Sequence, residues 1–369
     1  MYIYELADWP TFTWDVERLF HSLTEAVHLQ GVLFGRMEAL GSEARQEADA
    51  LVTAQTVISS SAIEGEYLDI SAVKHSIARQ RSLLSVTGMS IEHAVDGPVA
   101  MHLDATERHE DPLTLDRLHA WHRTLFPTGE SGKRTIAAGR LRDDENGRMQ
   151  VVSYSPGRPP IVLFEAPHAA VLECEMDRFL SYLNDNDLTH PFIKAAIVHL
   201  WFVTLHPYED GNGRIGRAII DYILARGEGS ALRFYSPSSQ IHKEQLSYYI
   251  RLELAQKGSL DITDWIVWFL DCLARSLANA KDIVASVLRR ERFYQMASAH
   301  SLSPNQHTVI AHYLDSFKGN LTSSNYATIC KVSQDTATRD LQDLCAKGLF
   351  VQMGAGRSTH YVPSPGFEQ

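Results

Sequence analysis

Twelve residues near the middle of the chain combine side chains and backbone that suit phosphate chemistry. They run from His206 to Arg217 and read HPYEDGNGRIGR. The Gly-Asn-Gly turn at 211–213 leads into an apolar helix, where successive backbone N–H groups and the helix dipole favour an anion. Arg214 and Arg217 are three residues apart, so both guanidinium groups can reach one phosphate chain. The segment therefore predicts a site for an oligophosphate.

Two further side chains of this segment could act on a bound phosphate. Asp210 places a carboxylate beside the turn, and a hard oxygen ligand next to phosphates is how Mg²⁺ is usually held. His206 is the side chain here whose ordinary pKa suits a general base near neutrality. Each feature alone is compatible with a structural role, such as a turn between helices or a helix cap. Their combination within twelve residues favours catalysis.

The segment resembles the HPFx(D/E)GNGRxxR signature of the Fic family at every defined position but one, because Tyr208 replaces the usual phenylalanine. The resemblance implies a nucleotidyltransferase, a protein adenylyltransferase that moves AMP from ATP to a Ser, Thr or Tyr hydroxyl of a target protein or of itself. In that reading His206 deprotonates the hydroxyl and Asp210 binds Mg²⁺. Asn212 and the flanking glycine amides would stabilise the α-phosphate, and two arginines would hold the β- and γ-phosphates. The implied ATP-binding residues here are Gly211, Asn212, Gly213, Arg214, Gly216 and Arg217.

Other positions refine the reaction and the base that is bound. Kinase-like relatives carry lysine at the place of Gly213, so glycine favours AMP transfer. Tyr248, Tyr249 and Gln256 resemble the residues that contact adenine, although glutamine stands where asparagine is usual. For the two tyrosines, a structural role on the helix is an equal alternative.

The stretch from Gly139 to Pro167 resembles the family's flap, and Gly139 and Arg142 match the GxxR that introduces it. In the family this hairpin pairs with an extended segment of the target protein as an extra strand. The resemblance thus places the protein target on residues 139–167. A hairpin that only shields the core is the alternative.

A second motif lies upstream of the signature. Ser60, Glu64 and Gly65 match the (S/T)xxxE(G/N) pattern of autoinhibited Fic proteins, whereas the neighbouring serines do not. The resemblance implies that Glu64 pairs with Arg217 and keeps this arginine from the γ-phosphate. A carboxylate competes with phosphate for one guanidinium group, so the idea is physically consistent.

The position of this motif implies the class with an N-terminal inhibitory helix. Residues Tyr4 to Trp14 also resemble the N-terminal module of one branch of these proteins. Some inhibited relatives remove AMP with the same glutamate, and the sequence leaves this open. The expected domains are an N-terminal helical module at 1–90, a Fic core at 91–296 and a winged-helix-like domain at 303–369.

A mainly α fold is predicted to position these residues. Apolar side chains recur at helical spacing up to about residue 296. Two β-prone runs, Met149 to Ser153 and Ile161 to Phe164, flank turn residues and predict one hairpin. Predicted helices cover two stretches within 13–60, the second with Ser42 as its N-cap, and 70–84, 90–107, 114–125, 170–183, 191–205, 217–226, 243–257 and 262–296.

The last seventy residues predict a separate unit, with a linker near 300–304. Helices at 304–317, 325–329 and 333–348 and a hairpin of strands 350–353 and 359–362 have the order of a winged helix. Residues 301–369 carry five Lys and Arg against five Asp and Glu, so their net charge is zero, whereas DNA-binding domains usually present a basic face. We favour protein docking or a homodimer. The alternative is a DNA-binding regulator whose Fic core senses nucleotide or removes AMP.

Composition limits the partners. The chain has 34 Lys and Arg against 45 Asp and Glu, a net charge of −11, which argues against attraction of the whole chain to nucleic acid or an anionic membrane. The N-terminus does not resemble a signal peptide, and the longest apolar run, Ala195 to Leu205, is too short to span a bilayer. Four scattered cysteines predict free thiols in a reducing compartment: Cys174, Cys272, Cys330 and Cys345. We expect a cytoplasmic protein.

Overall fold

Helices dominate the structure, as the sequence predicts. The computed structural model describes residues 1–84, 94–132, 134–145, 147–153, 159–315 and 320–364. They divide into two units, Met1–Ile283 and Val284–Gln369. The boundary lies inside one long helix, α11, which spans Thr263–Ser298, because Phe293 and Ala297 at its end are buried in the core of the second unit.

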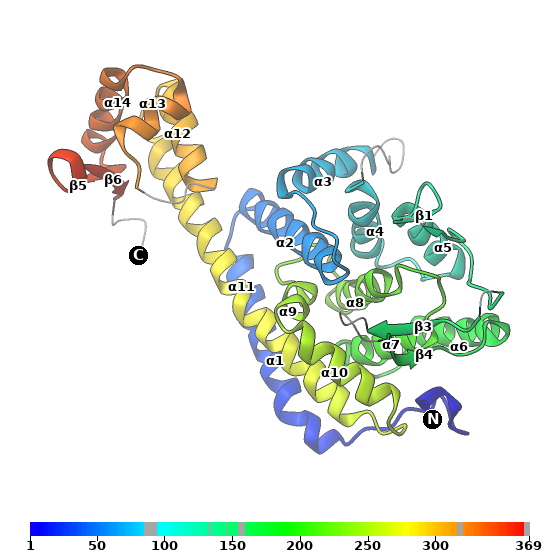
Figure 1. The fold of residues 1–369 in the computed structure, drawn as a ribbon. Coiled ribbons are helices and arrows are strands. Elements are labelled where there is room, and N and C mark those ends of the chain that lie inside the picture. Colours follow the sequence, from blue (N-terminus) through cyan, green and yellow to red (C-terminus); the bar gives the residue numbers. More distant parts are fainter. Residues whose placement is uncertain (85–93, 133, 146, 154–158, 316–319, 365–369) are drawn as a thin grey trace. The chain divides into compact units, whose positions relative to one another are not determined.

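The first unit contains ten complete helices among the described residues, together with the first part of α11 (Figure 1). They are α1 (Val16–Glu38), α2 (Ser42–Ile63), α3 (Ile70–Leu84), α4 (Asp96–Glu107), α5 (Leu115–Leu125), α6 (Leu172–Asn184), α7 (Pro191–Leu205), α8 (Asn212–Glu228), α9 (Pro237–Lys243) and α10 (Gln245–Gln256).

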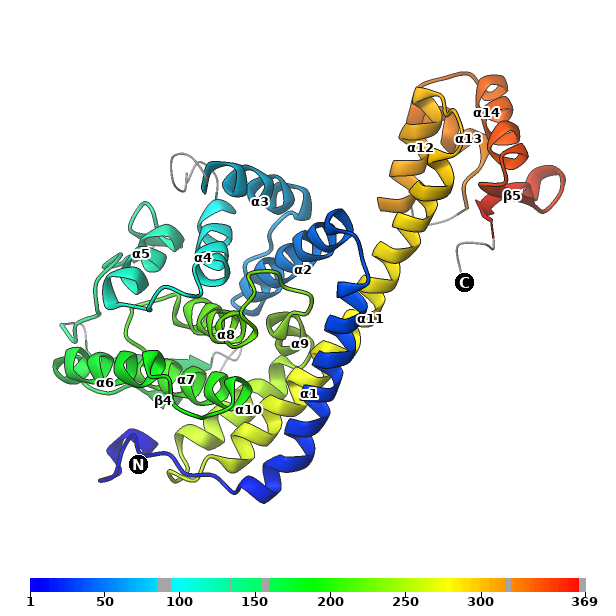
Figure 2. The same ribbon diagram turned by 180° about the vertical axis from the view of Figure 1, so that it is seen from behind.

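The centre of this unit is the pair α7 and α8. Every residue of α7 from Phe192 to Leu205 is buried, which explains its nearly continuous apolar sequence. α8 packs against α7 and is also contacted by α2, α4 and α5; viewed from behind, these helices surround α8 (Figure 2). The six-residue connection between α7 and α8 is therefore anchored at both ends by buried helices. The C-terminal end of α2 lies against α8.

Several predicted helix boundaries are wrong. α8 begins at Asn212, five residues before the predicted start, because Gly211 adopts a left-handed conformation (φ 78°) and serves as its N-cap. Gly41, not Ser42, is the N-cap of α2. The helix predicted for 243–257 begins at Gln245 and follows the separate short helix α9, which was missed. α4 begins at Asp96, and positions 90–93 of its predicted range lie outside the described residues.

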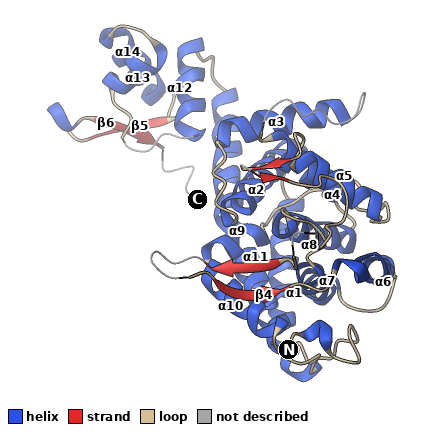
Figure 3. Cartoon of the chain, turned by 45° about the vertical axis from the view of Figure 1, so that its right-hand side comes forward, coloured by secondary structure: helices blue, strands red, loops and turns tan. Residues whose placement is uncertain are grey.

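The predicted hairpin is confirmed. Strands β3 (Gln150–Ser153) and β4 (Ile161–Glu165) pair antiparallel with a bulge at Val151 and Val152 (Figure 3). Positions 154–158 of its turn lie outside the described residues. The N-terminal segment braces this flap, since Tyr4 Oη donates to the carbonyl of Glu165 at 2.9 Å. A second small hairpin, β1 (Glu130–Ser131) with β2 (Arg134–Thr135), was not predicted.

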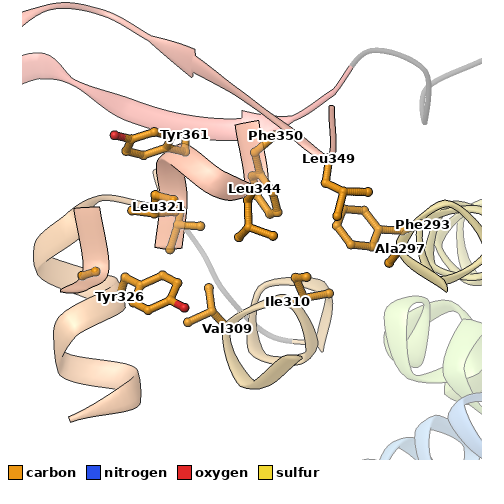
Figure 4. Close-up of a cluster of buried hydrophobic side chains, with 12 residues drawn as sticks. Phe293, Ala297, Val309, Ile310, Leu321, Tyr326, Leu344, Leu349, Phe350 and Tyr361 are labelled. Atoms are coloured by element: carbon orange, nitrogen blue, oxygen red, sulfur yellow. The ribbon is translucent and has the colours of Figure 1, made fainter. Parts of the chain in front are cut away.

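The second unit has the predicted element order. Three helices, α12 (Pro304–Asp315), α13 (Ser323–Cys330) and α14 (Gln334–Ala346), precede an antiparallel pair, β5 (Phe350–Met353) and β6 (His360–Pro363). One apolar cluster joins all of them to the end of α11 (Figure 4). Positions 316 and 317 of the predicted first helix lie outside the described residues.

Two other predictions can be compared with the structure. All four cysteines are free thiols, as expected. Among the described residues, no helix combines the length and the apolar character needed to cross a bilayer.

Candidate active site

The connection between α7 and α8 is held by Arg142, the arginine of the GxxR segment. Its side chain is 1% exposed, and its Nε donates to the carbonyl of His206 at 2.8 Å. Its backbone N–H donates to the carbonyl of Pro207 at 2.9 Å. His206 itself is the C-cap of α7 in a left-handed conformation (φ 48°, ψ 57°). This conformation turns the chain sharply, and Arg142 fixes the turn from the flap side.

The imidazole of His206 contacts the last turn of α7. Its Nδ1 lies 3.3 Å from the carbonyl oxygen of Val203, so Nδ1 carries the proton in the tautomer that this contact favours. Nε2 is then free to accept a proton. Burial lowers the pKa of His206 to about 4, which keeps the ring neutral at physiological pH.

Asp210 lies at the other end of the connection and is held by three neighbours. Its side chain is 44% exposed and accepts a hydrogen bond from the N–H of Gly211 at 2.5 Å and another from the hydroxyl of Ser131 in β1. Its backbone carbonyl lies 3.2 Å from Nε2 of His122. The other ring nitrogen of His122 accepts the N–H of Gly139 at 2.8 Å, so one buried histidine links the base of the flap to Asp210.

The side chain of Asn212 bonds to the backbone of Tyr208 within the connection. Its side chain is buried, and it accepts from the N–H of Tyr208 at 2.9 Å and donates to the carbonyl of Tyr208 at 2.7 Å. The amide is thus committed to the connection itself. The N–H groups of the first turn of α8 have no preceding helical turn to bond, so they can donate to an anion.

Both arginines of the signature are buried and contacted by the end of α2. Arg217 donates from Nε to Ser60 Oγ at 2.9 Å and from Nη2 to Glu64 Oε1 at 2.8 Å. Arg214 donates from Nη1 to Glu66 Oε2 at 2.7 Å. The expected contact between Glu64 and Arg217 is therefore present.

Gly213 and Gly216 have different roles. A Cβ on Gly213 would lie 2.2 Å from Glu64 Oε1, so only glycine lets this carboxylate approach the start of α8. A Cβ on Gly216 would instead meet Val203 and His199 at 3.1–3.2 Å. Gly216 therefore faces α7 and allows the two helices to pack closely. Its assignment to the ATP site stays a prediction.

Two cavities meet beside α8, and both are lined by Glu64, His206 and Gly213. One, of about 690 Å³, is polar and reaches Asp210 and residues of β3. The other, of about 310 Å³, is mostly apolar and contains Tyr249 and Gln256 in its wall. Tyr249 is 40% exposed, whereas Tyr248 is buried and bonded to His199 at 2.9 Å. The structure thus places the predicted base, metal ligand and adenine residues in the walls of two cavities that share three lining residues.

Sequence reasoning missed three of these residues: Glu66, Ser131 and His122. Glu66 carried a signal, since it is a second carboxylate two residues after Glu64. Ser131 and His122 lie about 80 and 90 positions before Asp210, and nothing in their local sequence indicates the contact.

The family model of the Fic/DOC family matches residues 112–224, which contain α5, the flap and the α7–α8 pair. The chain thus contains a Fic/DOC domain over these residues. Two further models match the segments on either side of this domain. A domain of unknown function, DUF4172, covers residues 2–83, and the C-terminal domain of a DIP2311-like transcriptional regulator covers residues 305–364.

Known Fic proteins are similar over much of the chain. The protein adenylyltransferase Fic of Aedes aegypti is 29% identical over 247 residues, which cover 63% of this chain and 42% of that protein. That of Nematostella vectensis is 27% identical over 254 residues, covering 67% and 53%. The chain thus spans about half the length of the curated relatives it matches.

A crystal structure of a Fic family protein from Desulfovibrio desulfuricans G20 shares the fold of this chain. The TM-score is 0.56 at 20% sequence identity, and the match covers 96% of this chain and 98% of that one.

Proposed function

We propose that this chain transfers AMP from ATP to a hydroxyl group of a protein and that Glu64 inhibits the transfer. Nε2 of His206 accepts the hydroxyl proton, and the oxygen attacks the α-phosphorus. The bond from this phosphorus to the oxygen that bridges to the β-phosphate breaks, and diphosphate leaves. The meeting of the two cavities at His206 and Gly213 supports this proposal most directly, because it brings a neutral base next to a helix N-terminus.

The two cavities suit the two ends of ATP. The apolar cavity offers Tyr249 and Ile250 to a planar base and Gln256 to its polar edge. The phosphates then lie along the first turn of α8, where N–H groups can bind negative charge and where Arg214 and Arg217 can do so once their carboxylate partners leave. This arrangement leaves the polar cavity, with its access to β3, for the target hydroxyl.

Asp210 fits the Mg²⁺ that the family implies. Mg²⁺ is usually bound by one or two carboxylates together with substrate phosphates and water. Asp210 provides one half-exposed carboxylate in the polar cavity, and the described residues contain no cluster of three or more metal-ligating side chains that would form a protein-only site. When bound, the metal would neutralise phosphate charge. Ser131 and the N–H of Gly211 orient the carboxylate.

Inhibition by Glu64 follows from what this carboxylate contacts. It lies against Gly213 at the start of α8 and binds Nη2 of Arg217. The carboxylate of Glu64 thus occupies the position at the start of α8 that would bind a phosphate. It therefore excludes a phosphate from the guanidinium group of Arg217. Ser60 holds the same arginine through its hydroxyl and its carbonyl, which keeps Arg217 turned toward α2.

The flap supplies a docking edge for the target segment. Met149, Gln150 and Val152 line the polar cavity, so β3 lies beside the proposed catalytic base. A peptide that pairs with this hairpin is bound through hydrogen bonds of its backbone, so most of its side chains do not affect binding. Its hydroxyl-bearing residue would then be placed near His206.

DNA binding by the second unit is a second candidate function. Asp340 accepts from Tyr326 Oη at 2.7 Å and Asp343 accepts from Gln306 at 2.7 Å, so two acidic side chains of α14 are engaged inside the unit while Arg339 is exposed. The matching family model describes a transcriptional regulator. A mobility-shift assay with the full chain at low and moderate salt, with Arg339→Ala as the matched variant, tests this. No shift at low salt removes the candidate.

The position of the label in ATP tests the enzymatic proposal. Purified wild type, Glu64→Gly and Glu64→Gly/His206→Ala are incubated with Mg²⁺ and ATP labelled at the α- or the γ-phosphate. We expect protein-bound label from α-labelled ATP with Glu64→Gly and none with the double variant. Label from γ-labelled ATP would instead indicate a kinase, and equal labelling of the double variant would exclude His206 as the base.

A further inference from the structure

A second carboxylate at the end of α2 contacts the other arginine of the signature. Oε2 of Glu66 lies 2.7 Å from Nη1 of Arg214. The side chain of Arg214 is only 4% exposed, whereas that of Glu66 is 47% exposed. A buried guanidinium group thus has a half-exposed carboxylate as its ion-pair partner.

The turn that ends α2 explains why two carboxylates reach α8 together. The N–H of Gly65 donates to the carbonyl of Ala62 at 3.0 Å, and the N–H of Glu66 donates to that of Ser61 at 3.0 Å. These two bonds define a Schellman motif, and Gly65 has the positive φ (81°) that the motif requires. The chain reverses at Gly65, with Glu64 before it and Glu66 after it.

The spacing of the two acidic residues matches that of the two arginines. Arg214 and Arg217 are three apart on α8 and therefore lie about one helical turn from each other. Glu64 contacts Arg217 and Glu66 contacts Arg214. One reversal of the chain therefore delivers one carboxylate to each arginine.

We propose that Glu66 is a second inhibitory carboxylate, which holds Arg214 until a phosphate of ATP replaces it. This inference rests on the proposed function, because it needs Arg214 to bind phosphate. It assigns to Glu66 a role that the sequence motif gives only to Glu64. Loss of Glu64 alone then leaves the site partly inhibited.

The surroundings of Arg214 favour replacement of Glu66 over movement of the arginine. The guanidinium group lies 5.1 Å from the centre of the Phe126 ring, and its Nη2 is 3.8 Å from Asp210 Oδ1. These contacts and its burial fix Arg214 in the first turn of α8. Glu66 is half in solvent, so its carboxylate can be rehydrated when it leaves.

Binding of Mg²⁺-ATP, measured by titration calorimetry in a His206→Ala background to prevent AMP transfer, tests the proposal. We expect Glu66→Gln to lower the Kd for ATP about fivefold, because a half-exposed pair that competes with the ligand is removed. Glu43→Gln, an equal change of charge at an exposed position in the first turn of α2, should leave the Kd unchanged.

A double-variant cycle shows whether Glu66 acts through Arg214. Arg214→Lys removes the planar guanidinium group that contacts Glu66. In this background Glu66→Gln should change the Kd for ATP less than twofold. A fivefold gain that persists there would mean that Glu66 only stabilises the end of α2, and would overturn the proposal. Equal Kd values for the parent and Glu66→Gln would also overturn it, while leaving the proposed function intact. Absence of ATP binding in every variant would contradict the proposed function itself.

Discussion

Replacement of Glu64 by glutamine should release the site while keeping the size of the side chain. Glu64 Oε1 lies 2.8 Å from Nη2 of Arg217, and the two side chains are 32% and 1% exposed. A hydrogen bond that involves charged groups contributes about 1.5–3 kcal/mol. Because Glu64 is one-third exposed, the lower end applies, and about 1.5 kcal/mol corresponds to about a tenfold increase in kcat/KM for ATP.

Initial rates of AMP incorporation at ATP concentrations well below KM give this ratio. Glu43→Gln is the control, since it removes the same charge from an exposed position of the same helix. If Glu64→Gln and Glu43→Gln have equal kcat/KM values, Glu64 does not compete with phosphate for Arg217, and the reasoning from the ion pair is refuted.

Three further predictions test the scaffold of the site. Asn212→Ala should lower the free energy of unfolding by about 2 kcal/mol, because it leaves the buried backbone of Tyr208 without both hydrogen bonds; urea denaturation measures this, and unchanged stability contradicts it. Gly216→Ala should destabilise by about 1–3 kcal/mol, since its Cβ would lie 3.2 Å from the His199 ring, and should leave the Kd for ATP unchanged. Weaker ATP binding with full stability would place Gly216 in the ATP site after all. Acidification from about pH 7.5 to about pH 5 should destabilise the fold by about 2 kcal/mol for each of His122 and His199. Burial lowers both pKa values to about 4, so below about pH 6.5 the unfolded chain binds more protons than the folded one. Denaturation of wild type and His199→Gln at both pH values should show a smaller pH effect in the variant, and equal effects would contradict the assignment to His199.

The sequence predicted the residues that share one short segment and those that follow a local pattern. His206, Asp210 and Arg217 lie in one twelve-residue stretch whose residue types already indicate phosphate chemistry. The hairpin of the flap was predicted because two β-prone runs flank strong turn residues. The contact of Glu64 with Arg217 was expected only from a resemblance, since the two residues are 153 positions apart.

The direction in which each side chain points could not be predicted. With α8 starting at Asn212, Gly213 and Arg217 are four residues apart and share the face toward α2, while Gly216 faces α7. Because the helix was predicted to start at Arg217, the different faces of Gly213 and Gly216 could not be predicted. The amide of Asn212 likewise turned to the backbone of Tyr208, because both groups are buried and need partners.

Contacts between hairpins and helices that are distant in the sequence also could not be predicted. Ser131 reaches Asp210 from a two-stranded hairpin that is too short to have a periodic pattern. His122 joins Gly139 to Asp210 only after α5 has packed beside the connection. Such residues are ordinary in their local sequence and gain their role from tertiary packing.

The identity of the covalent product tests the central claim most directly. Glu64→Gly and Glu64→Gly/His206→Ala are each incubated with Mg²⁺-ATP, digested and analysed by peptide mass spectrometry. We expect a peptide of Glu64→Gly whose Ser, Thr or Tyr carries the mass of one AMP, and no such peptide from the double variant. A phosphorylated peptide, or an AMP adduct that persists without His206, would contradict it.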